Sequence, residues 1–132
     1  MKLLFVRTDD MKPFANQVAE NLRRCDIDCI TYKQVLRQTR LDTPIARALE
    51  EMVQEYNAVL VFASKGLLTN DHALRLVDLA AANGNLVSIL PHHVSDRLTL
   101  PASFIASSLL LLRAGPDPEI FAREIFTALM KR

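Results

Sequence analysis

Short runs of apolar residues recur along this chain, and segments with helical spacing separate them. The run at residues 58–63 is apolar at every position, a pattern typical of a central parallel strand that is covered on both faces. Residues 86–90 and 109–112 have a similar character. The five segments predicted to form strands are 2–7, 29–32, 58–63, 86–90 and 109–112.

Between and after these runs, apolar residues recur three or four positions apart, which places them on one face of a helix. The longest stripe runs from Ile45 to Tyr56, with Thr43 expected as the N-cap and Pro44 as the first helical residue. Helices are also expected after Pro13, over residues 71–83 before Gly84, and over residues 119–130. The polar and irregular residues 34–42 are predicted to form an exposed loop.

Five strands that alternate with helices predict an α/β fold with three layers. Crossovers between parallel strands are right-handed, so the helices should cover both faces of the sheet. We therefore expect a flavodoxin-like sandwich with a five-stranded parallel sheet in the order 2-1-3-4-5. The length of 132 residues is typical of one domain, so residues 1–132 are predicted to form a single domain.

Composition and charge narrow the possible partners. The net charge of +1 gives no broad basic surface, so no nucleic-acid partner is expected. The apolar run at residues 108–112 is too short to span a membrane, and no membrane partner is expected. Cys25 and Cys29 match no zinc or redox spacing, so we expect no metal site and two buried, unreactive thiols. Reduced thiols are typical of a cytoplasmic protein.

The residues best placed to bind a ligand follow the first and third predicted strands. In open parallel sheets, ligands bind outside the carboxyl ends of the strands, where the strand order reverses. The predicted ligand-binding residues there are Thr8, Asp9, Ser64 and Lys65. Asp9 and Asp10 resemble the acidic pair of phospho-acceptor receiver domains, but Ser64 follows the third strand where those domains have an aspartate. Asp9 and Asp10 are therefore interpreted as helix caps, and Ser64 as the cap of the next turn.

Four segments, taken in order, resemble the Toll/interleukin-receptor (TIR) domain family over nearly the whole chain. The family's first box, an apolar strand followed by a polar turn, is similar to residues 3–10. Its proline-containing loop before the second helix is similar to residues 40–45, and its third strand with the serine that follows is similar to residues 59–68. Residues 86–91, followed by 100–101, resemble its fourth strand and the next loop. The resemblance implies a divergent TIR domain with a role in signalling and immunity.

The resemblance also implies where an enzymatic activity would reside. Enzymatic members of the family hydrolyse NAD with a glutamate on the helix after the third strand. Counting from Ser64 reaches Leu76, and that helix contains no glutamate. Its carboxylates are Asp71 and Asp78, each one methylene shorter than a glutamate, and these are the candidate catalytic residues if an aspartate substitutes. We expect no catalytic activity.

The function predicted first is therefore a protein-interaction and signalling module that acts through homotypic or partner assembly. TIR assemblies commonly use the loop after the second strand, which corresponds to residues 38–45 here. The residues predicted to contact a second copy or another protein are Arg40, Leu41, Asp42 and Pro44. Two alternatives stay open: an NAD-consuming glycohydrolase with a non-standard carboxylate, and a nucleotide-binding sensor. The interaction module needs no cofactor, whereas NAD would be a ligand or substrate under the alternatives.

Overall fold

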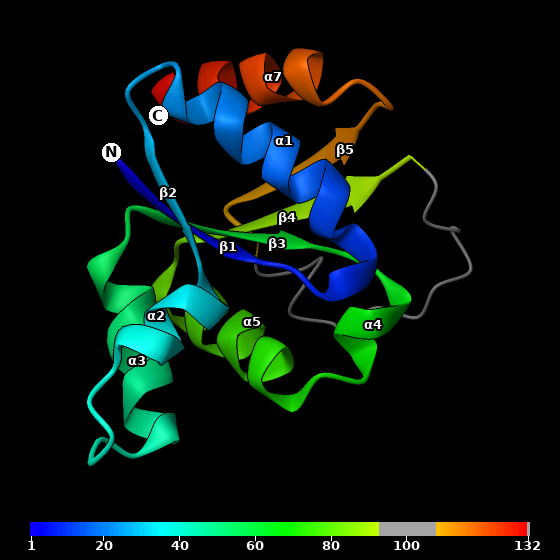
Figure 1. The fold of residues 1–132 in the computed structure, drawn as a ribbon. Coiled ribbons are helices and arrows are strands. Elements are labelled where there is room, and N and C mark those ends of the chain that lie inside the picture. Colours follow the sequence, from blue (N-terminus) through cyan, green and yellow to red (C-terminus); the bar gives the residue numbers. More distant parts are fainter. Residues whose placement is uncertain (93–107, 132) are drawn as a thin grey trace.

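One five-stranded sheet runs through the middle of the molecule (Figure 1). The computed structural model of the chain describes residues 1–92 and 108–131. Its strands are β1 (Lys2–Val6), β2 (Asp28–Thr31), β3 (Ala58–Phe62), β4 (Leu86–Pro91) and β5 (Leu110–Ala114). They stand in the order β2-β1-β3-β4-β5, and each neighbouring pair is parallel. The predicted three-layer sandwich and its strand order are confirmed.

Helices cover both faces of this sheet (Figure 1). The helices α1 (Lys12–Arg23) and α7 (Pro118–Met130) lie on one face, and α3 (Ile45–Glu55) and α5 (Asp71–Asn83) lie on the other. Three shorter helices follow strand ends or a turn: η1 (Asp9–Met11), α2 (Tyr32–Gln38) and α4 (Lys65–Leu68). Within the described parts of the chain, no helix is both long enough and apolar enough to cross a membrane.

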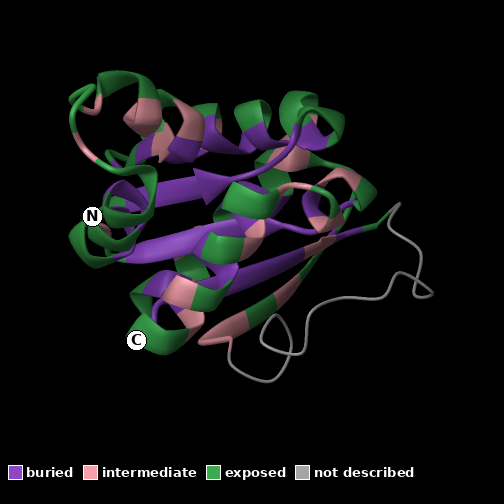
Figure 2. Cartoon of the chain, turned by 90° about the horizontal axis from the view of Figure 1, so that it is seen from below, coloured by how far each residue is buried: buried purple, intermediate pink, exposed green. Residues whose placement is uncertain are grey.

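The two faces of the sheet hold separate apolar clusters because side chains alternate along each strand. Leu3 and Phe5 of β1 pack in the cluster beneath α1 and α7. Leu4 and Val6 pack in the cluster beneath α3 and α5. Every residue of β3 is buried, and Figure 2 shows the central strands as a buried layer between more exposed helices. The run at 58–63 is apolar at every position because both faces of β3 are covered.

The prediction of a loop over residues 34–42 is wrong for its first half. A capping box starts α2 there: Gln34 N–H donates to Thr31 Oγ1 at 3.3 Å, and Thr31 N–H donates to Gln34 Oε1 at 3.2 Å. Tyr32, predicted as the end of the second strand, is the buried first residue of this helix. A box that satisfies two backbone donors stabilises the helix despite its polar sequence.

The run at 109–112 is apolar, but β5 is an edge strand rather than a central one. Its burial alternates along the strand, and Leu111 is an exposed large apolar side chain. The edge position agrees with the predicted strand order, whereas the apolar composition of the run does not distinguish an edge strand from a central one.

The predicted C-cap of α5 is confirmed, but the predicted N-cap of α3 is wrong. Pro44, not Thr43, is the N-cap of α3, and no side chain caps that end. Ile45, expected on the buried stripe, is 51% exposed because the stripe begins one turn later. Gly84 ends α5 with a φ of 77°, as expected of a C-cap glycine. The TIR-like positions 100–101 lie outside the described residues.

The two thiols differ in their surroundings. Cys29 is buried on β2, and burial raises its pKa to about 11, with Arg23 acting in the opposite direction. It is therefore an unreactive thiol, as expected. Cys25 lies just beyond the end of α1 and is exposed, so its predicted burial is wrong. The chain turns there, at Asp26, with a φ of 62°.

Candidate functional site

The carboxyl ends of β1 and β3 are joined by a hydrogen-bonded cluster of four residues. Asp10 Oδ1 accepts hydrogen bonds from Thr8 Oγ1 and from Ser64 Oγ, the latter at 3.0 Å. Asp10 Oδ2 accepts from the Gly66 backbone N–H at 3.1 Å. A Cβ added at Gly66 would lie 2.7 Å from Thr8 Oγ1, so a larger residue here would force the Thr8 or Asp10 side chain to move. We call Thr8, Asp10, Ser64 and Gly66 the strand-end latch.

Two opposing effects act on the Asp10 carboxylate in the latch. Partial burial acts to raise its pKa, but the hydrogen bonds from Thr8, Gly66 and Ser64 together outweigh burial and hold the pKa below its ordinary value. Ser64 also caps α4, because its Oγ accepts from the Leu67 backbone N–H at 3.2 Å, and the predicted capping role of Ser64 is confirmed. The latch therefore fixes the first turns after β1 and β3 relative to each other.

The four predicted ligand-binding residues separate into two groups. Thr8 and Ser64 are buried in the latch, with their hydroxyl oxygens 3.0 Å apart. Asp9 points away from them, and its Oδ1 lies 3.2 Å from Lys33 Nζ. Lys65 is an exposed side chain on the first turn of α4. Ligand binding by these four residues stays a prediction.

The interpretation of Asp9 and Asp10 as helix caps is wrong. Thr8 is the N-cap of η1 and Met11 the N-cap of α1, and neither end has a side-chain cap. The Asp10 carboxylate instead reaches across to the residues that follow β3. Sequence proximity favoured local capping, whereas the parallel pairing of β1 with β3 brings a more distant set of donors within reach.

The candidate catalytic carboxylates lie on the solvent-facing side of α5. Asp71 is an exposed residue in the first turn of the helix, where a negative charge is favourable next to the helix dipole. Asp78 is also exposed. Leu76, the position that the TIR resemblance assigns to the glutamate, is fully buried against the sheet. A catalytic role for Asp71 or Asp78 stays a prediction.

The loop at residues 38–45 connects α2 to α3 and projects from the molecule (Figure 1). The Thr43 backbone N–H donates to the Arg40 carbonyl at 3.0 Å, which closes a turn at its tip. Leu41 in this turn is 106% exposed, more than any other large apolar side chain among the described residues. Arg40 Nε lies 3.6 Å from Asp42 Oδ1, and both side chains extend into solvent.

Sequence reasoning missed a cavity of about 510 Å³ at the β2 edge of the sheet. Its walls come from α1, the strands β1 and β2, and α2. The available signal was the polar face of α1, where Lys12, Asn16 and Glu20 recur every four residues and therefore line up. The opposite wall was not predictable, because α2 was expected to be a loop.

Comparisons with known proteins identify the fold. Neither the family models nor the curated proteins match the sequence. The Clostridium botulinum CMP N-glycosidase BcmB is similar in structure, with a TM-score of 0.64 and 8% identity over 97% of this chain and 99% of the enzyme. The SEFIR domain of IL-17 receptor B has a TM-score of 0.65 and 11% identity over 97% of this chain and 96% of the domain. This chain therefore has a flavodoxin-like α/β fold of the kind found in TIR-like domains.

Proposed function

We propose that this chain is a TIR-like protein-interaction and signalling module that assembles with a second copy of itself through the 38–45 loop. The observation that carries the proposal is the complete exposure of Leu41 at the tip of the loop. A folded domain normally spreads its exposed apolar side chains singly, but Leu41 is followed along the loop by the half-exposed Ile45. Burying one leucine side chain is worth about 1.5–3 kcal/mol, which favours a contact here.

The charged side chains on the loop and the first turns of α3 can pair with those of a second copy of the same surface. Arg40 and Asp42 form one exposed ion pair at 3.6 Å, and Arg47 and Glu51 form another at 3.1 Å. A two-fold contact places the same patch on both partners, so the basic member of each ion pair can lie opposite an acidic member on the second copy. Such pairs contribute mainly to specificity and to the rate of association.

The conformation of the loop lowers the cost of ordering it on assembly. Pro44 has its φ at −58° and is the N-cap of α3, while the turn from Arg40 to Thr43 is closed by a backbone hydrogen bond. Residues that are already held in one conformation lose less entropy when they enter an interface. The fold of the IL-17 receptor B SEFIR domain, a receptor domain, supports the same class of function.

The proposal is tested by light scattering and sedimentation of residues 1–132 over a concentration series. Leu41→Ala should weaken self-association about tenfold or more, because it removes the apolar centre of the contact. Arg40→Glu and Asp42→Arg should each weaken it by like-charge repulsion across the two-fold axis. Mixing the two charge variants should restore association, since each then meets an opposite charge. Arg123→Glu, on the exposed surface of α7, is the matched control.

Two results would contradict the proposal. The first is a monomer at every concentration of the unchanged chain. The second is association that Leu41→Ala leaves unaltered while circular dichroism confirms an intact fold. Restoration by mixing is diagnostic, because a general loss of stability in either variant would not be repaired by the other.

A second candidate function is hydrolysis of an N-glycosidic bond, with NAD or another nucleotide as substrate. The similarity in fold to the CMP N-glycosidase BcmB favours it. A carboxylate next to the sugar would stabilise the oxocarbenium-like transition state. Asp71 and Asp78 are exposed on α5, where water surrounds a carboxylate, and electrostatic stabilisation is weaker in water than in an enclosed site. We therefore rank this function below assembly.

A further inference from the structure

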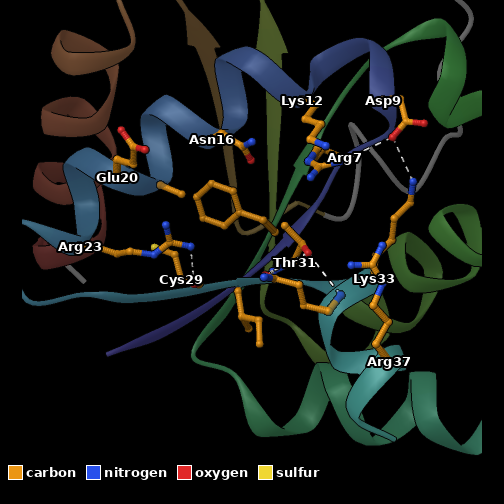
Figure 3. Close-up of a pocket in the computed structure, with 14 residues that line it drawn as sticks. Arg7, Asp9, Lys12, Asn16, Glu20, Arg23, Cys29, Thr31, Lys33 and Arg37 are labelled. Atoms are coloured by element: carbon orange, nitrogen blue, oxygen red, sulfur yellow. Dashed lines mark hydrogen bonds and ion pairs between the residues drawn. The ribbon is translucent and has the colours of Figure 1, made fainter.

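The cavity beneath α1 concentrates positive charge (Figure 3). Its walls carry five basic side chains and two acidic ones, an excess of three positive charges in a chain whose net charge is +1. The basic residues are Arg7, Lys12, Arg23, Lys33 and Arg37. They come from three separate segments of the sequence, so the fold rather than a basic run assembles them. A cleft with an excess of one sign raises the local concentration of ligands of the opposite sign.

Arg7 is the most informative member of this set. It follows the last residue of β1 and its side chain is only 9% exposed. Its Nε is buried and has no hydrogen-bond partner among the described residues. Its Nη1 lies 3.8 Å from Asp9 Oδ1, beyond hydrogen-bond distance. Burial of an incompletely paired guanidinium is costly, and an anion in the cavity that Arg7 lines would offset part of this cost by its charge.

Asp9 marks where such an anion would lie. Its Oδ1 accepts a hydrogen bond from Lys33 Nζ at 3.2 Å and faces Arg7 Nη1 on the other side. Figure 3 shows Lys12 at the same end of the cavity. The Asp9 side chain is 84% exposed, so it can turn into solvent and leave the basic groups to a ligand. The Asp9 carboxylate thus occupies the position that an anion of higher negative charge would take.

We propose that this cavity binds a small phosphomonoester, with the phosphate between Arg7 and Lys33. A phosphomonoester carries about −1.5 to −2 charge at neutral pH, which matches several cations better than a single carboxylate does. Arginine also presents its donors in a fork that fits phosphate oxygens. Arg37, one turn further along α2 than Lys33, adds to the field at this end.

The remainder of the cavity accommodates a hydroxylated body attached to the phosphate. Its volume of about 510 Å³ lies in the range of small-molecule sites. Figure 3 places Asn16 midway along the cavity and Glu20 with Arg23 at the far end. An amide and a carboxylate are suited to hydroxyl groups of a sugar. The cavity lies at the β2 edge of the sheet, between α1 on one face and α2 on the other. The exposed side chains proposed for assembly, Leu41 among them, do not line it.

Calorimetry on the whole chain at low ionic strength tests the assignment with three probes: AMP, ribose 5-phosphate and inorganic phosphate. We expect AMP or ribose 5-phosphate to bind at least tenfold more tightly than inorganic phosphate. If AMP alone binds, the body is a nucleoside; if both esters bind alike, it is a sugar. Binding by neither ester, or equal binding of inorganic phosphate, would overturn the proposal.

Variants separate this site from general attraction of anions. Lys33→Ala should weaken binding of the better ester about tenfold, the usual effect of losing a charged hydrogen bond. Asp9→Asn should strengthen it, because the competing carboxylate is removed while the fold is kept. Arg75→Ala, an exposed arginine of α5 on the other face, is the matched control. Equal loss in Lys33→Ala and Arg75→Ala, or weaker binding by Asp9→Asn, would refute the assignment.

Discussion

At the scale of single residues, neighbouring aspartates in one short segment have opposite roles. Asp10 holds the ends of β1 and β3 together, whereas Asp9 is exposed and lies between two basic side chains at the mouth of a cavity. Neither acts as the local helix cap that the sequence suggests. The distinction arises because Asp9 and Asp10 lie in the 3₁₀ helix η1, where consecutive side chains point in different directions around the helix.

The role of Asp10 predicts a dependence of stability on pH. Its pKa in the folded protein is below its ordinary value of 3.8, so it contributes stability that is present above that value and is lost as the pH falls below it. Asp10→Asn should lower the free energy of unfolding by about 1 kcal/mol at neutral pH, because the carboxylate is partly exposed. Urea titrations at several pH values should show this difference vanishing in acid.

Asp9→Asn is the matched control for that experiment, because it changes the adjacent and more exposed carboxylate. We expect it to leave stability nearly unchanged at neutral pH. A constant difference between the unchanged chain and Asp10→Asn across the acid range would show that the carboxylate charge of Asp10 does not stabilise the latch.

At the scale of elements, α2 contributes to the basic cavity and also positions the start of the 38–45 loop. Lys33 and Arg37 of this helix line the cavity, and its last residue leads into the 38–45 loop. Its seven residues are too few to be stable alone, so the capping box at Thr31 and the burial of Tyr32 carry much of its stability.

Thr31→Ala should therefore lower the free energy of unfolding by about 1 kcal/mol, the usual cost of losing an N-cap side chain. Denaturant unfolding measures this loss, and the slope of the unfolding free energy against denaturant concentration should stay unchanged. Thr43→Ala is the control, because Thr43 does not cap α3 and the substitution should cost less than about 0.5 kcal/mol. Equal losses at the two positions would mean that the capping box contributes nothing specific.

At the scale of the whole molecule, one fold serves proteins with different functions. Two structures of similar fold are an N-glycosidase and a receptor domain, and each shares only about a tenth of its residues with this chain. Function therefore has to be argued from the sites rather than from the fold. Here the exposed loop and the basic cavity adjoin at α2 but depend on different side chains, so they can be tested separately.

The absence of a carboxylate at Leu76 predicts the outcome of an activity assay. Incubation of the chain with NAD should release no nicotinamide above a blank, because the position implied by the TIR resemblance is a buried leucine. Chromatographic detection of nicotinamide provides the measurement. Release that disappears in Asp71→Ala or Asp78→Ala would instead establish the glycohydrolase, and Glu119→Ala on α7 would be the matched control.

The sequence by itself determined the elements whose patterns are local. The run at 58–63 and the helix at 71–83 with its glycine C-cap were predictable, because alternation and capping depend on near neighbours. The order of the strands followed from general rules on crossovers. Only the tertiary structure decided that Asp10 meets Ser64 and that Arg7 and Lys33 both approach Asp9 at the cavity mouth. These contacts join residues far apart in the chain, and no local pattern encodes which distant side chains will converge.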